Sequence, residues 1–256
     1  MSKTVTSRTR LTILRDERRI LRLRRIGLYV GFGGMVVLIA GFLLGIFSSG
    51  QQILLYQGLA MLIGLPMSQG GLYLINRYAR NPRPDQLLDQ ALGKTVSNGR
   101  IYHYLLPAPH VLLADNGLMV FVLKYQGGKI RADGDQWQQK IFFMRKLFGT
   151  ESLGNPTRDA ERASSDLANY LQKVAPEVAQ KNIPIQPIIV FTTNINDLDV
   201  KGSRIPALHY TKLRGYMKQT MTNNAPLPRA DYAALQAALD QAAAKLTPVE
   251  DDGNFS

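Results

Sequence analysis

The stretch HVLLADNGLMVFVLKYQGGKI, residues 110–130, contains the residue with the clearest potential for chemistry, Lys124. Two apolar runs, 110–114 and 118–123, flank an Asp-Asn-Gly turn, which is a strong β-hairpin signal. Lys124 therefore ends a predicted strand. A lysine in this place can orient an attacking water when neighbouring carboxylates hold a metal ion. Because the sequence has no acidic residue from 116 to 132, any such carboxylates must come from elsewhere.

The other candidates for catalysis form weaker patterns. His103, His110 and His209 are the only histidines, and the first two lie on neighbouring predicted strands. A shared metal is geometrically open to them, although no cysteine or adjacent carboxylate supports it. The stretch GFGGMV, residues 31–36, follows no predicted strand, which argues against a phosphate-binding loop. No nucleophile-elbow spacing is present.

Several basic residues offer contacts for an anion. Lys212 and Arg214 lie in a predicted helix over about 207–221, and Lys129 lies in a predicted strand over 128–132. Together with Lys124, they are our candidates for contact with nucleic acid or another anion. The alternative for the basic stretch at 201–218 is a solvated helix face.

Composition places these residues in a chain of uneven charge. The protein has 256 residues, no cysteine and a formal net charge of +12. Disulfides and thiolate metal sites are therefore excluded. Residues 1–25 contain nine basic and two acidic residues, whereas residues 26–76 contain no charge. The remainder is only mildly basic, so its charge alone does not imply a nucleic-acid partner.

The uncharged region predicts two membrane spans. Residues 26–47 are all apolar or small, and about 20 such residues suffice to cross a bilayer as a helix. Residues 53–75 are also long enough, although Gln57, Pro66 and Gln69 weaken the pattern, and a re-entrant helix is the alternative. The short SSGQQ connection predicts a helical hairpin. A cleaved signal peptide is disfavoured because the first run is too long and begins too late.

Basic residues on both sides of the hairpin predict its orientation, because basic flanks remain in the cytoplasm. Both termini should therefore be cytoplasmic. The segment 9–25 contains leucines among arginines and is compatible with an amphipathic helix on the membrane surface, while contact with nucleic acid or a protein remains the alternative. We expect the following residues to set topology or contact lipid headgroups: Arg18, Arg19, Arg22, Arg24, Arg25, Arg77 and Arg80.

The soluble part, residues 84–246, predicts a mixed α/β fold. A helix over 85–96 begins at Asp85, a suitable helix cap. Strands are expected over 101–106, 110–114, 118–123 and 128–132, followed by a helical region over 155–182 that Pro176 interrupts. A buried strand over 185–191 precedes helices at about 207–221 and 229–246. This order predicts helices packed on a mixed sheet, with the hairpin at its centre. Residues 136–148 carry Trp137 and an apolar run, and residues 247–256 read as a flexible tail.

With its elements in this order, the domain resembles the nuclease-related domain, NERD, a branch of the PD-(D/E)XK restriction-endonuclease-like fold. The resemblance covers roughly residues 84–220. It rests on HVLLADNGLMVFVLK, then GGKI, then Asn-Pro before a long helix, and then PIIVF. No single piece is specific, and the match depends on their order and spacing. The resemblance implies a nuclease that holds Mg²⁺ with carboxylates.

The family pattern is only half retained. Aligned on the Asn-Gly turn, the family lysine corresponds to Lys124, and the acidic residue of the family's first helix corresponds to Asp85. The family glutamate corresponds to Val122 and the family aspartate to Pro109, whereas its neighbouring histidine is retained as His110. Magnesium prefers hard oxygen ligands, which valine and the proline side chain lack. Compensation by Asp133 or Asp135 is an alternative, although both are poorly placed.

We therefore expect a catalytically degenerate nuclease-like domain anchored by a two-helix hairpin, with no metal and no cofactor. Its expected partners are the lipid bilayer and a membrane or cytoplasmic protein for which it serves as scaffold or accessory subunit. The expected location is a prokaryotic plasma membrane. Two alternatives remain open: a membrane-tethered nucleic-acid-binding module and an active Mg²⁺-dependent nuclease with relocated ligands. For Lys124 itself, we expect either a pair with Asp85 or a solvent-facing strand end, and a retained phosphate contact is the alternative.

Overall fold

The computed structural model describes residues 11–47, 50–96, 98–140, 152–181, 183–193, 195–223 and 225–246. Two compact units are present, and each is described by itself. One contains Glu17–Pro84. The other contains Asp85–Lys140 and the chain from Leu153 onward, together with the residues that precede Glu17.

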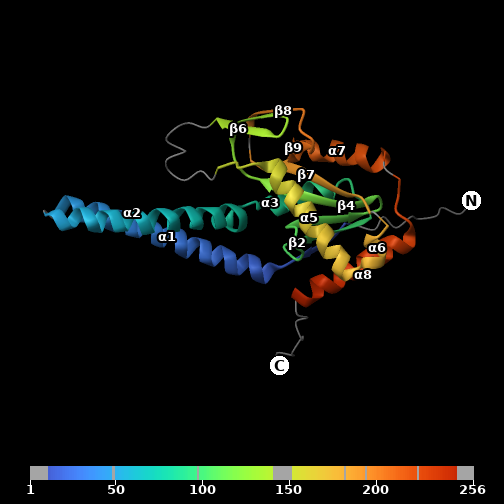
Figure 1. The fold of residues 1–256 in the computed structure, drawn as a ribbon, viewed down its shortest axis with the longest axis horizontal. Helices are drawn as coiled ribbons and strands as arrows, with labels where there is room; N and C mark the ends of the chain where they lie inside the picture. Colours follow the sequence, from blue (N-terminus) through green and yellow to red (C-terminus); the bar gives the residue numbers. More distant parts are fainter. Residues whose placement is uncertain are drawn as a thin grey trace, which may run out of the picture. The chain divides into compact units, whose positions relative to one another are not determined.

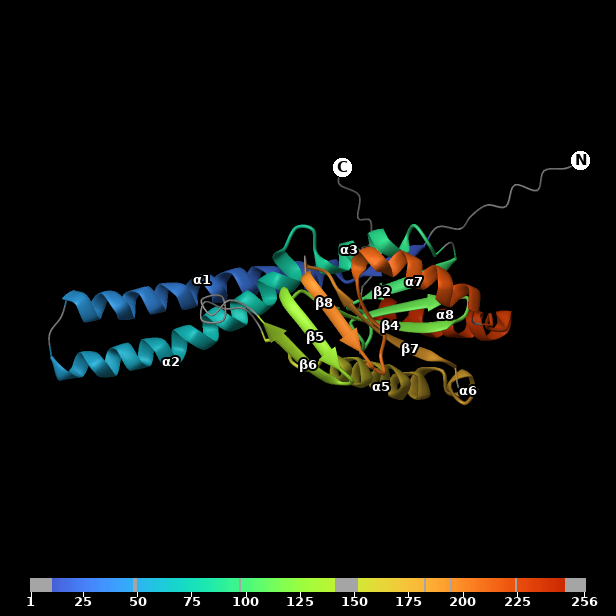
Figure 2. The ribbon, with the colours of Figure 1, turned by 90° about the horizontal axis from the view of Figure 1, so that it is seen from above.

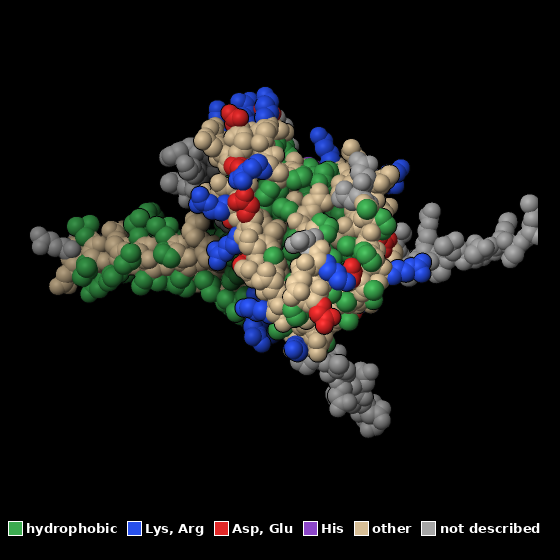
Figure 3. All heavy atoms as spheres, turned by 45° about the vertical axis from the view of Figure 1, so that its right-hand side comes forward, with side chains coloured by type: hydrophobic (Ala, Val, Ile, Leu, Met, Phe, Trp, Pro, Cys, Tyr) green, Lys and Arg blue, Asp and Glu red, His purple; other side chains and the backbone are tan. Residues whose placement is uncertain are grey.

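The first unit is a helical hairpin. Helix α1 spans Glu17–Phe47, helix α2 spans Gln51–Leu74, and a π-helical turn, η1, spans Ile75–Ala79. Figure 2 shows α1 and α2 side by side. Both candidate spans are long and apolar enough to cross a membrane, and only 11% of each apolar window is buried. The core helix of a soluble protein would be mostly buried, whereas apolar side chains cover the surface of this hairpin (Figure 3).

Helix α1 begins nine residues earlier than the predicted span. The segment before it forms strand β1, Thr12–Arg15, in place of an amphipathic helix over 9–25. Arg18 to Arg25 therefore continue into the first span as one helix. Arg77, at the other end of the hairpin, lies in η1, where its guanidinium is 4.1 Å from the centroid of the Tyr73 ring.

Small residues allow the two helices of the hairpin to approach closely. A Cβ atom at Gly34 would lie 2.5 Å from the backbone nitrogen of Ser68, and one at Gly27 would lie 2.7 Å from the Cβ of Leu74. A Cβ at Gly71 would collide with the backbone of Gly31. Spans enriched in small residues at such crossings pack through backbone contact. The spacing of Gly27 and Gly31 is therefore used for packing within the hairpin.

Gly71→Leu is expected to separate the helices, whereas Gly70→Leu should be tolerated, because a Cβ at Gly70 meets nothing within 4 Å. Overpacking of this kind costs about 1–3 kcal/mol. The chain has no cysteine, so Leu38→Cys with Gly64→Cys provides a clean disulfide reporter, since these two positions contact each other. Oxidative cross-linking should fall with Gly71→Leu and persist with Gly70→Leu. Equal yields would contradict backbone packing at Gly71.

The second unit contains a six-stranded mixed sheet. Its strand order is β1-β2-β3-β4-β7-β9, in which only β2-β3 and β3-β4 are antiparallel neighbours. The hairpin of β3 and β4 lies at the centre of the sheet, as predicted. The strands other than β1 span Gly99–His103 for β2, His110–Ala114 for β3, Gly117–Lys124 for β4, Ile185–Phe191 for β7 and Ala207–His209 for β9.

Helices cover both faces of this sheet. Leu167 of α5 (Pro156–Val174) and Leu239 of α8 (Arg229–Leu246) pack against one face, together with the short helix α6 (Pro176–Ala179). Leu88 of α3 (Pro84–Leu92) and Leu213 of α7 (Tyr210–Asn223) pack against the other. Figure 1 shows α5 lying across the sheet. The predicted mixed sheet flanked by helices is confirmed, and the predicted interruption at Pro176 separates α5 from α6.

A second, three-stranded sheet has the order β6-β5-β8. Strand β5 spans Gly128–Asp133, β6 spans Gln136–Lys140, and β8 spans Ile195–Lys201. Ile130 packs with Phe191 and Ile189 in a third apolar cluster, while Trp137 donates a hydrogen bond from Nε1 to Thr157 Oγ1 at 2.8 Å. Sequence reasoning did not separate β5 from the main sheet and missed β1, β6, β8 and β9, the last of which lies at the start of the helix predicted over about 207–221. The predicted apolar run after Lys140 and the predicted tail over 247–256 lie outside the described residues.

Candidate functional site

Asp85 and Asp89 are one helical turn apart on α3, so both carboxylates lie on the same side of the helix. Arg15, the last residue of β1, pairs with both: its Nε lies 3.1 Å from Asp85 Oδ2, and an Nη atom pairs with Asp89 Oδ2. Asp85 is fully buried. The guanidinium thus occupies the position between two carboxylates that a cation would otherwise take. Asp85, which the resemblance aligned with the acid on the family's first helix, is held in an ion pair.

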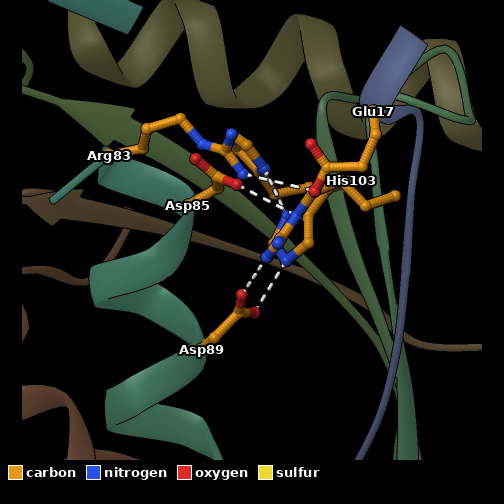
Figure 4. Close-up of polar contacts among 7 residues, drawn as sticks. Glu17, Arg83, Asp85, Asp89 and His103 are labelled. Atoms are coloured by element: carbon orange, nitrogen blue, oxygen red, sulfur yellow. Dashed lines mark hydrogen bonds and ion pairs between the residues drawn. The ribbon is translucent and has the colours of Figure 1, made fainter. Parts of the chain in front are cut away.

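Two histidines extend this network into the sheet. His103 Nε2 lies 2.8 Å from Asp89 Oδ1, and Figure 4 shows Asp89 reaching from α3 toward His103. His103 and His110 face each other across β2 and β3, with their Nδ1 atoms 2.8 Å apart. These contacts form one continuous chain from Asp89 through His103 to His110, in which the tautomer of each ring decides which nitrogen donates. Both rings are buried. The shared metal considered for this pair is replaced by direct hydrogen bonding.

Lys124 has a different partner from the one expected. Its Nζ lies 2.6 Å from Asp159 Oδ2 and donates to the carbonyl oxygen of Leu153 at 3.1 Å. Asp159 belongs to the first turn of α5, where a carboxylate also favours the helix dipole. Lys124 is only 8% exposed. The expected pair with Asp85 and the expected solvent-facing strand end are both wrong.

The family's two central ligand positions hold no side-chain oxygen. Val122 packs against two of the apolar clusters, and the carbonyl of Pro109 accepts a hydrogen bond from the backbone N–H of Tyr104 at 2.8 Å. The paired register of β3 and β4 ends at Val111 and Val120, so Pro109 precedes it and Val122 follows it on the neighbouring strand. Neither position offers a side-chain oxygen to a metal ion.

The Mg²⁺ implied by the family does not fit these residues. Magnesium needs several hard oxygen ligands, and of the four family positions only Asp85 has a carboxylate, which Arg15 neutralises. Within the described ranges, no group of three or more histidine, aspartate or glutamate side chains is placed to hold a metal ion.

Asp133 and Asp135, the alternative acids, do not lie beside Lys124 as metal ligands. Asp135 follows β5 of the second sheet, and its Oδ2 lies 2.5 Å from Arg204 Nε. The hydrogen bond from Arg204 holds the pKa of Asp135 below its ordinary value. Asp133 ends β5 on the same sheet, whereas Lys124 ends β4 of the main sheet. Neither acid joins the retained lysine.

The predicted anion contacts do not converge. Lys129 lines a pocket of about 120 Å³ on the second sheet, Lys212 lines an open pocket of about 480 Å³ beside β9, and Arg214 lines a groove of about 300 Å³ between α3 and α7. Lys124 is buried against Asp159. The four candidates therefore form no common surface.

Sequence reasoning missed Arg15, Asp89 and Asp159 as members of this site. Asp89 had a usable signal, because it lies four residues after Asp85 in a predicted helix. Asp159 had a weaker one, as an acid in the first turn of a helix that begins after Asn-Pro. No sequence signal singled out Arg15, because it is one of nine basic residues that precede the first span.

The pairing of Lys124 predicts a measurable coupling with Asp159. Lys124→Met should lower the free energy of unfolding by about 1–2 kcal/mol, because the Leu153 carbonyl and the Asp159 carboxylate each lose a donor. Asp159→Asn should cost less, because its side chain is 52% exposed and remains hydrated. Thermal melts of the two single variants and the double variant give the coupling energy. Strict additivity would contradict the pair.

Comparison with known proteins agrees with this architecture. Residues 86–192 match the model of the nuclease-related domain family, NERD. The match includes the central hairpin, β5, α5 and β7, which are the elements that carried the resemblance in the sequence. No curated protein and no solved structure is similar enough to count as a match. The nuclease-related domain is thereby established for this part of the chain.

Proposed function

We propose that this chain, which carries a nuclease-related domain, is a membrane-anchored scaffold or accessory subunit whose domain has lost metal-dependent cleavage. One observation supports this most strongly. The two central ligand positions are Pro109 and Val122, while the remaining acid, Asp85, is neutralised by Arg15. Positioned carboxylates are what such a mechanism requires to hold its metal. The domain keeps the fold and offers its surface for binding.

The membrane part of the proposal draws on length, composition and charge. Two adjacent helices are apolar enough to span a bilayer, and their surfaces are apolar. Basic residues flank the hairpin on both sides, whereas its short connection has none. By the positive-inside rule, both termini are cytoplasmic, and the proposed location is the plasma membrane of a prokaryote.

The test uses the full chain in neutral detergent micelles. Calorimetric titration with Mg²⁺ and Mn²⁺ is combined with a cleavage assay on single-stranded and duplex DNA and on RNA. We expect no saturable metal binding and no cleavage. Co-purification of a stoichiometric protein partner from the native membrane would support the scaffold role. Metal-dependent cleavage that Lys124→Ala abolishes would overturn the proposal and assign an active nuclease.

A second candidate function, nucleic-acid binding without cleavage, is favoured by the groove between α3 and α7. Lys94 and Arg214 line this groove with Tyr210. Among the described residues, neither cation has a recorded ion pair. Binding through such residues would weaken steeply with salt, because phosphate contacts release counterions. A salt titration of oligonucleotide binding, with Lys94→Gln/Arg214→Gln as the variant, separates this function from scaffolding.

A further inference from the structure

The exposed face of the second sheet carries a small basic pocket. It has a volume of about 120 Å³ and is lined by Lys129 and Arg131 of β5 and by Gln138 and Lys140 of β6. Lys129 lies directly opposite Lys140, and Arg131 lies opposite Gln138. Because side chains alternate along a strand, all four point to the same face. Three cations and one amide thus converge on one pocket.

This arrangement has an electrostatic cost within the sheet. Like charges directly opposite each other on neighbouring strands are destabilising. In the described part of the chain, no hydrogen bond or ion pair is recorded for the side chains of Lys129, Arg131 or Lys140. By contrast, Arg204 pairs with Asp135 and Glu161. Arg131 is also the register partner of Asp199 in β8, so a carboxylate borders the cations on this face. A bound anion would offset the repulsion that remains between Lys129 and Lys140.

We infer that this pocket binds the phosphate diester of an anionic phospholipid headgroup. Its volume suits a phosphate group and lies well below that of an ordinary small-molecule site, which is about 300–1,000 Å³. No aromatic side chain lines it. Sites for single-stranded nucleic acid usually add aromatic platforms on which bases stack. The neighbouring Trp137 does not serve here, because its indole bonds to Thr157 and packs near Phe191.

The apolar helices of the chain favour lipid as the source of this phosphate. Two helices of the chain are long and apolar enough to cross a membrane. The inference rests on the membrane placement proposed above, but not on the loss of metal-dependent cleavage.

The test places a reporter beside the pocket in the full chain, held in neutral maltoside micelles. Because the chain has no cysteine, Gln136→Cys takes a single environment-sensitive dye on the same face of β6. The probes are dioctanoyl phosphatidylglycerol, dioctanoyl phosphatidylcholine, inorganic phosphate and an oligodeoxythymidine. We expect a saturable response to phosphatidylglycerol alone.

Variants assign the response to the pocket. Each basic residue near anionic lipid contributes about fivefold to affinity, so Lys129→Gln/Arg131→Gln/Lys140→Gln should weaken binding by about 100-fold. The control, Lys173→Gln/Lys218→Gln/Lys245→Gln, removes the same charge from exposed positions on α5, α7 and α8 and should retain affinity. Thermal melts check that the pocket variant folds, since Lys129→Gln removes the repulsion from Lys140 whereas Arg131→Gln removes the attraction to Asp199.

The inference would be overturned if phosphatidylglycerol gave no saturable response, or if phosphatidylcholine gave an equal one. A response to inorganic phosphate or oligodeoxythymidine without one to phosphatidylglycerol would also overturn it. So would an unchanged affinity for phosphatidylglycerol in the pocket variant. Failure of the proposed loss of cleavage would appear instead in the metal titration and the cleavage assay. The two proposals therefore fail separately.

Discussion

Replacing Arg15 with methionine is expected to lower the free energy of unfolding by about 3–5 kcal/mol, because it leaves two carboxylates without their cation in a buried site. Asp85 is fully buried, and the side chain of Asp89 is only 11% exposed. Methionine fills the space of the arginine stem but supplies no charge. The network would then depend on His103 alone to bond Asp89.

Thermal unfolding of the full chain in neutral micelles checks this result, with fluorescence of Trp137, the only tryptophan, as the reporter for the domain. A loss of 3 kcal/mol corresponds to a fall of about 6–12 °C for a domain of this size. Arg162→Met is the matched control, since Arg162 is 84% exposed and lies 3.9 Å from Asp166, so it should cost less than about 0.5 kcal/mol. Adding Asp85→Asn to Arg15→Met should recover part of the loss. Equal losses of unfolding free energy in Arg15→Met and Arg162→Met would contradict a stabilising role for the buried ion pairs of Arg15.

The importance of Arg15 shows where sequence reasoning succeeds and where it stops. The hairpin of β3 and β4 was predictable because alternation and an Asp-Asn-Gly turn are local signals. The buried strand β7 and the interruption at Pro176 were local signals as well. Arg15 pairs with a residue 70 positions away, and charge counting cannot distinguish an arginine that faces a domain from one that faces lipid.

The partner of Lys124 was unpredictable for a related reason. Alignment to a family identifies which ligands are missing, but it does not show what the remaining polar groups bond to instead. Burial requires each of them to find a partner. Asp85 pairs with Arg15, and Lys124 pairs with Asp159 on α5. Arg15 lies outside the matched residues 86–192. Two ion pairs thus hold the polar groups that remain at the positions matched to the family site.

Restoring both acids, with Pro109→Asp and Val122→Glu, is expected to create Mn²⁺-dependent stability that the wild-type protein lacks. Pro109 lies two residues before Val111, and Val122 lies two residues after Val120, the partner of Val111 on the neighbouring strand. We therefore expect carboxylates at 109 and 122 to repel each other until a divalent cation binds between them. Without metal, the variant should be less stable than the wild type, because Val122 contributes to apolar packing. With Mn²⁺ at 100 times its dissociation constant, the gain is about 2.7 kcal/mol.

Thermal melts of the full chain with and without Mn²⁺ measure this gain as a rise of about 5–11 °C in the double variant. Pro109→Asn/Val122→Gln is the matched control, because it introduces similar shapes without charge and should not respond. The wild-type protein should not respond either, since Arg15 already neutralises Asp85, the one acid that the family positions retain. A wild-type response as large as that of the acidic variant would mean that the chain holds a metal through other ligands, and the proposed loss of metal-dependent cleavage would lose its main support. A response confined to the acidic variant would show that two side chains separate this domain from a metal-binding member of its family.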